Sequence, residues 1–100
     1  MNENQNNQVK QEAPKSRFGL QEKHTVEGIE YTFQFPGVKA TIDLLDRCRN
    51  GFGNVVDGSY YEEIMEHVIV SPKVDWEYWD ENGGLREVMN LADRFLGRQL

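Results

Sequence analysis

The sequence predicts a small α+β domain that is mostly helical, with three to four helices, an N-terminal β-hairpin packed on them and a disordered N-terminal tail. Three observations support this prediction. Apolar and polar side chains alternate over residues 29–35, which is the period of a half-buried strand. Pro36-Gly37 ends the alternation, and apolar residues then recur at helical spacing. Residues 1–17 have almost no apolar side chains to offset their ordering entropy, so residues 18–100 are expected to form the single domain.

Residues 18–35 are expected to form the hairpin around a two-residue turn at Glu27-Gly28. Glycine adopts a positive φ without steric cost, as such a turn requires. The turn would place His24 opposite Tyr31. The shared apolar face is expected to consist of Val26, Ile29, Tyr31, Phe33 and Phe35. Because an isolated hairpin is marginally stable in water, this face must lie on the helices.

The first two helices are predicted from apolar stripes and end signals. The first is expected from Val38 to Arg49, with a stripe formed by Val38, Ile42, Leu45 and Arg49 and flanked by Thr41, Leu44 and Cys48. Ser59 and Glu62 match a capping box, so the second helix is expected to begin behind a Ser59 cap. It should end before Ser71-Pro72, because proline lacks an N–H donor and restricts the residue before it.

The C-terminal third is expected to add one or two further helices. The segment from Val74 to Glu81 is either a short helix capped by Asp75 or an irregular stretch. Asn82-Gly83-Gly84 separates it from a final amphipathic helix, expected from Leu85 to residue 98. The apolar side of that helix would be formed by Leu85, Val88, Met89, Ala92, Phe95 and Leu96.

Composition excludes several classes of function. The net charge of −6 repels phosphate, so we expect no nucleic-acid partner. No apolar run is long enough to cross a bilayer, and no signal peptide is expected at the N-terminus. The single cysteine, Cys48, fits a reducing cytosol and is expected to be a buried hydrophobe. A domain this small is near the lower limit of independent stability, which leaves self-association open.

No set of residues in the sequence matches a catalytic or metal site. His24 and His67 are the only histidines, whereas zinc sites draw on several His or Cys ligands. Gly51-Phe52-Gly53 lacks the third glycine of a phosphate-binding loop. We therefore expect no cofactor, no metal and no enzymatic activity.

The best binding candidate is the segment that holds both tryptophans. Its aromatic side chains interleave with acidic ones, and aromatic residues are enriched at binding hot spots. Packing of the same aromatics on the core is the competing interpretation, and both remain open. The apolar loop residue Phe52 either folds back on the core or offers a contact. The candidate partner-binding residues are Trp76, Tyr78, Trp79, Phe52, Asp80 and Glu81.

The order of short motifs along the chain suggests a family. The motifs are residues 31–37 (YTFQFPG), a helix with Asp46-Arg47-Cys48, a Gly/Asn-rich loop, residues 60–70 (YYEEIMEHVIV) followed by Ser71-Pro72-Lys73, an aromatic–acidic stretch and a last helix. This order resembles the tail assembly chaperones of long-tailed bacteriophages and related prophages of Gram-positive bacteria. The resemblance extends over residues 20–97.

The resemblance implies a non-enzymatic factor of the host bacterial cytoplasm that is absent from the mature virion. Such a chaperone holds the long tape-measure protein in soluble form and helps tail-tube subunits polymerise around it. In many such phages a ribosomal frameshift appends a domain that recruits the tube protein, and this chain would be the short form. The polar N-terminal tail departs from the family pattern.

Two other functions remain as alternatives. A head–tail connector or tail completion protein would be a structural part of the virion, and mass spectrometry of purified particles separates it from a chaperone. An acidic inhibitor that mimics DNA would need carboxylates in a spaced helical array. The acidic residues here are instead spread among apolar stripes.

Overall fold

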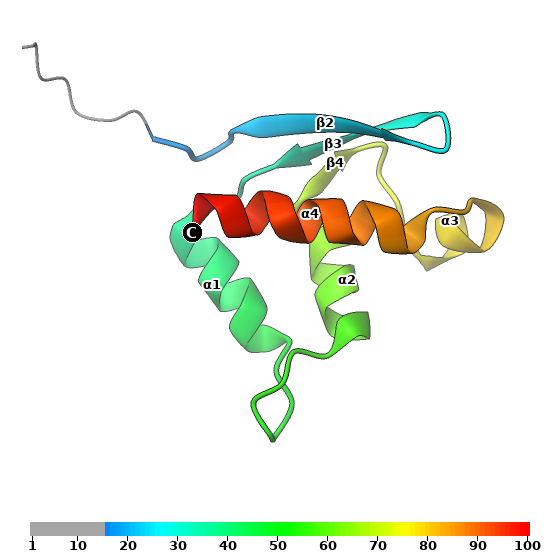
Figure 1. Ribbon diagram of the computed structural model, residues 1–100. Coiled ribbons are helices and arrows are strands. Elements are labelled where there is room, and N and C mark those ends of the chain that lie inside the picture. Colours follow the sequence, from blue (N-terminus) through cyan, green and yellow to red (C-terminus); the bar gives the residue numbers. More distant parts are fainter. Residues whose placement is uncertain (1–15) are drawn as a thin grey trace, which may run out of the picture.

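The computed structural model describes residues 16–100, and the predicted tail at 1–15 lies outside the described residues. Figure 1 shows a three-stranded antiparallel sheet along one side of a group of helices. The strands, in sheet order, are β2 (Gln21–Val26), β3 (Ile29–Gln34) and β4 (Ile69–Ser71). The helices are α1 (Val38–Arg47), α2 (Asp57–His67), α3 (Trp76–Glu81) and α4 (Leu85–Gln99). The predicted α+β, mostly helical fold class is confirmed.

The hairpin forms with the predicted turn and register. Glu27 and Gly28 both have positive φ, 50° and 80°, which matches the right-handed twist of the flanking strands. His24 lies opposite Tyr31, as the two-residue turn requires. The predicted apolar face is buried at Val26, Tyr31, Phe33 and Phe35 and half-buried at Ile29.

The core lies between the sheet and the helices. In Figure 1, α4 runs along the sheet, and α1 and α2 extend from the other side of α4. Phe33 of β3 packs on Phe95 of α4, with ring centroids 5.9 Å apart. The predicted apolar side of α4 is buried at Val88, Met89, Ala92, Phe95 and Leu96, and half-buried at Leu85. None of the helices within residues 16–100 combines the length and apolar character that a bilayer crossing needs.

The prediction for α1 was wrong in its end and in its buried face. The helix ends at Arg47, two residues early, and buries Thr41 and Leu44, followed by Cys48 at the C-cap. Val38 and Ile42 of the predicted stripe are instead 48% and 41% exposed. Thr41 can be buried because its hydroxyl donates to the Gly37 carbonyl at 2.7 Å. Burial also raises the pKa of the Cys48 thiol, which fits the expected inert cysteine.

The predicted capping box of α2 does not form. The helix begins at Asp57 with Val56 as N-cap and no side-chain cap, so Ser59 lies inside the first turn. Val56 has extended backbone and donates its N–H to the Cys48 carbonyl at 2.8 Å. This contact with the end of α1 determines where α2 begins. A local sequence motif contains no information about such a contact between distant residues.

Strand β4 is absent from the prediction, which continued the second helix toward Ser71-Pro72. The helix ends at His67, and residues 69–71 instead pair with β3, Phe33 opposite Ile69 and Thr32 opposite Ser71. β-Branched side chains such as Ile69 favour this pleated, buried position. The short strand returns the chain to the sheet, and the four residues that follow it connect it to α3.

Candidate partner-binding surface

Helix α3 has the predicted Asp75 cap. The backbone N–H of Tyr78 donates to Asp75 Oδ1 at 2.8 Å, which satisfies one free donor of the first turn. The helix is short, and none of its residues is fully buried. Its position therefore depends on its aromatic side chains.

Tyr78 and Trp79 attach α3 to the core. The Trp79 ring stacks on Tyr31 with centroids 5.9 Å apart, and its indole N–H points to Met65 Sδ at 3.3 Å. The Tyr78 and Tyr31 hydroxyls are hydrogen-bonded at 2.6 Å. Burial first, and then this hydrogen bond, raise the pKa of Tyr31 far above its usual value. Both α3 side chains are half-buried, so packing is a large part of their role.

Trp76 lies differently from the other two aromatics. It is 41% exposed, and its indole N–H donates to Glu62 Oε2 of α2 at 2.9 Å. It borders a shallow groove of about 180 Å³ between α2 and the segment before α3. The groove has an apolar floor and an acidic rim, lined by Glu62, Met65, Glu66, Lys73, Val74, Asp75 and Trp76. We call this feature the α2–α3 groove.

The carboxylates around the α2–α3 groove have no cationic partner within residues 16–100. Glu62, Glu66 and Asp75 line the groove, and Glu77, Asp80 and Glu81 are exposed on the adjoining helix α3. The ion pairs of the described chain involve other acids. Like charges placed near one another repel, so a surface of this kind favours a positively charged partner.

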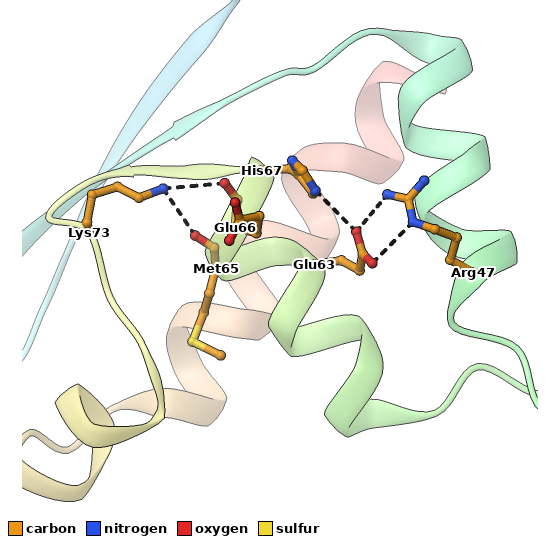
Figure 2. Close-up of polar contacts among 6 residues, drawn as sticks. All are labelled: Arg47, Glu63, Met65, Glu66, His67 and Lys73. Carbon is orange, nitrogen blue, oxygen red and sulfur yellow. Dashed lines mark hydrogen bonds and ion pairs between the residues drawn. The ribbon is translucent and has the colours of Figure 1, made fainter.

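Lys73 is the one basic residue that lines the groove, and its charge is directed elsewhere. Its ammonium donates to the backbone carbonyls of Met65, Glu66 and Ile69 at 3.3–3.4 Å, two of which are drawn in Figure 2. A cation is favoured at a helix C-terminus, where the last carbonyls lack partners. Lys73 thus stabilises the end of α2 rather than forming an ion pair with a rim carboxylate.

The neighbouring face of α2 presents a paired carboxylate. Arg47 of α1 donates to both Glu63 oxygens, at 2.7 and 3.2 Å, and His67 Nε2 lies 3.5 Å from Glu63 Oε1 (Figure 2). The hydrogen bond from Arg47 is the main cause that lowers the pKa of Glu63. A cavity of about 230 Å³ lies beside this cluster. Because Glu63 is held by Arg47, the cluster joins α1 to α2 and is a poor proton acceptor.

The other predicted residues lie apart from one another. Asp80 and Glu81 are exposed on α3, as expected for a rim. Phe52 is 91% exposed in the loop between α1 and α2, which is far from α3 in Figure 1. That loop is held by Asn50, whose Oδ1 accepts from the backbone N–H groups of Phe52 and Asn54 at 2.9 and 3.1 Å. Among the six candidates, Trp76 alone lines the α2–α3 groove, whereas Tyr78 and Trp79 pack on the core and Phe52 lies on a separate loop.

Sequence reasoning missed the α2 side of the groove. Glu62, Met65 and Glu66 follow one another at i, i+3 and i+4, which places them on a single helix face. That spacing could have paired them with the aromatic segment. The Nε2 of His24, the other histidine, lies 2.8 Å from Glu22 Oε1, and its ring packs beside Phe33 with centroids 5.5 Å apart. Within residues 16–100 no group of three or more His, Cys, Asp or Glu side chains is arranged to hold a metal ion.

Comparisons with known proteins identify no relative. No protein-family model matches the chain, and neither a curated protein nor a solved structure is significantly similar to it.

Proposed function

We propose that the protein is a tail assembly chaperone, which binds and solubilises a phage tape-measure protein in the host cytoplasm and is left out of the virion. The proposal rests on the motif order of residues 20–97, which resembles that family. The observation that carries it is the α2–α3 groove, where half-exposed Trp76 lies beside three carboxylates that have no cationic partner within residues 16–100. A surface of this composition suits binding better than catalysis.

The chemistry of the surface suits a long helical client. Before assembly a tape-measure helix exposes an apolar stripe, and an apolar groove can cover part of such a stripe. The net charge of −6 would keep the resulting complex dispersed through mutual repulsion. Help with polymerisation of the tail-tube protein is part of the same proposal and requires a further contact with that protein.

Co-expression tests the proposal directly. The tape-measure protein is produced alone, with this chain, and with an unrelated acidic protein of similar size. We expect the tape-measure protein to remain in the supernatant and to co-purify only with this chain. Failure to co-purify while both proteins are soluble would contradict the proposal.

A structural role in the virion is the second candidate. It is favoured by Phe52, which the hydrogen-bonded loop holds at 91% exposure in a position suited to a permanent contact. Mass spectrometry of purified particles separates the two functions. We expect the chain to be absent from particles, whereas a connector or completion protein would be present in a fixed ratio to the other tail proteins.

A further inference from the structure

We propose that the α2–α3 groove receives an arginine side chain from an amphipathic helix of the partner. The arginine stem would lie on the apolar floor, and its guanidinium would face Trp76 and the rim carboxylates. This inference rests on the proposed function only for the identity of the partner, since the chemistry of the groove defines the side chain that it accepts.

The size of the groove favours a single side chain. Its volume of about 180 Å³ lies below the roughly 300–1,000 Å³ of small-molecule sites. The apolar lining consists of Met65, Val74 and Trp76. Met65 and Val74 are nearly buried, so the half-exposed Trp76 offers most of the apolar surface that can cover the methylene groups of a long side chain.

The indole of Trp76 is held in place before any partner binds. Its N–H donates to Glu62 Oε2 at 2.9 Å, which fixes the ring against α2 while 41% of the residue stays exposed. A cation is attracted to the face of an indole ring, and arginine takes this position more often than lysine. A preorganised ring loses little entropy on binding.

Charge complementarity selects the same occupant. Glu62, Glu66 and Asp75 line the groove, and Lys73 directs its ammonium to the carbonyls at the end of α2. Glu66 has no cationic partner within residues 16–100. A guanidinium can both stack on an aromatic ring and donate to a carboxylate in one planar geometry, whereas an ammonium acts as a point charge. Arginine is therefore the expected side chain.

The first arm of the test uses a peptide and the full chain. The probe is a capped amphipathic helical peptide with one arginine at the edge of its apolar face, compared with the same peptide carrying lysine or glutamine there. Affinities are measured by calorimetry. We expect the arginine peptide to bind about tenfold more tightly than the glutamine peptide, with lysine between them. Equal affinities for arginine and glutamine would overturn the inference.

Variants of the chain locate the site. Trp76→Ala and Glu66→Gln should each remove most of the arginine preference. The matched controls are Phe18→Ala, another exposed aromatic, and Glu30→Gln, an equal charge change on the outer face of the sheet. Both controls should bind as the unmodified chain does. Glu66→Gln keeps the test informative if Trp76→Ala fails to fold, and an unchanged preference in Glu66→Gln would overturn the inference.

The second arm repeats the affinity measurement with the tape-measure protein. A complex that is weakened by Glu66→Gln and not by Glu30→Gln supports both the inference and the proposed function. A complex that forms but ignores Glu66→Gln overturns the inference and leaves the proposed function intact. If the arginine peptide binds as expected and the tape-measure protein does not, the groove chemistry stands and the proposed function falls.

Discussion

Helix α2 presents neighbouring glutamates in opposite situations. On one side, Glu63 receives two hydrogen bonds from Arg47 and lies 3.5 Å from His67. On the adjacent face, Glu62 and Glu66 border the α2–α3 groove without a cationic partner within residues 16–100. The same residue type thus joins two helices on one side and remains available for a partner on the other. A carboxylate that forms an ion pair within the fold has a structural role, whereas a carboxylate without a cationic partner in the fold is available to bind another molecule.

The three aromatic residues of α3 show the same division. Trp79 and Tyr78 are half-buried against Tyr31, and they hold α3 on the domain. Trp76 donates a hydrogen bond to Glu62 and leaves 41% of its surface exposed. The two interpretations that the sequence left open, core packing and partner contact, therefore apply to different residues of one short helix.

The largest expected effect separates the two tryptophans. Trp79→Ala removes the stack on Tyr31 and should lower the free energy of unfolding by about 3 kcal/mol, whereas Trp76→Ala should lower it by less than about 1 kcal/mol. Urea denaturation followed by circular dichroism measures both. Similar losses of unfolding free energy in the two variants would contradict the proposal that Trp79 holds α3 on the domain while Trp76 is available to a partner.

A second effect tests a buried residue of α2. The Tyr60 hydroxyl donates to Asp93 Oδ1 at 2.6 Å, and Tyr60→Phe should lower the free energy of unfolding by about 1 kcal/mol. Burial, followed by the contact with Asp93, raises the pKa of Tyr60 above its usual value. Its stabilising contribution is therefore complete below pH of about 10 and decreases as pH rises, because only the unfolded chain ionises readily.

Alkaline unfolding measures this contribution. Stability of the unmodified chain should decrease more steeply above pH of about 10 than that of Tyr60→Phe, which lacks one of the titrating groups. Burial also raises the pKa of Tyr31. Because Tyr31 is unchanged in the Tyr60→Phe variant, the stability of that variant should still decrease at alkaline pH, but less steeply. Identical slopes would show that Tyr60 ionises as freely in the folded chain as in the unfolded one.

A smaller effect concerns the paired glutamate. Glu63→Gln should lower the free energy of unfolding by about 0.5 kcal/mol at neutral pH, since the pair with Arg47 is partly exposed to solvent. The pKa of Glu63 is lowered in the folded chain, so its contribution is complete above a pH of about 4.3 and is lost as pH falls through the lowered value. The difference between Glu63→Gln and the unmodified chain should therefore vanish in strong acid, and a difference that persists would contradict the role of charge.

The smallest effect is expected on the groove side. Glu66→Gln should change the free energy of unfolding by less than about 0.5 kcal/mol, because its carboxylate has no cationic partner among residues 16–100 and its removal lessens repulsion along the rim. Thermal unfolding of the two chains under matched low-salt conditions checks this. A marked loss of stability would mean that Glu66 has a structural partner and that the groove is not a free surface.

Local patterns predicted the hairpin and α4, and they offered a short helix as one of two interpretations of the α3 segment. Tertiary contacts instead determine the buried face of α1, the start of α2 and strand β4, and the predictions for these were wrong. The two-residue turn at Glu27-Gly28 fixes the register without help from distant residues. Helix α1 carries two adjacent stripes, so its periodicity alone could not show that Thr41 and Leu44 are buried while Ile42 is exposed. Strand β4 depends on pairing with β3, which no local signal reports.

The candidate site was predicted on one side only. The aromatic–acidic pattern of α3 is visible within six consecutive residues, from Trp76 to Glu81. The α2 side needs Glu62 and Glu66 to face a segment that follows an intervening strand, and that strand was absent from the prediction. The exposed loop residue Phe52 was grouped with α3 by residue type alone, and the fold places its loop far away.

One pair of variants tests the central claim most directly. The affinity of the full chain for the tape-measure protein is measured together with its free energy of unfolding, for Glu63→Gln and for Glu66→Gln. We predict that Glu63→Gln loses stability and keeps its affinity, whereas Glu66→Gln keeps its stability and loses affinity. If the tape-measure protein binds the unmodified chain and binds both variants with equal affinity, the claim is contradicted. The claim is that Glu63 has a structural role and Glu66 contacts the partner.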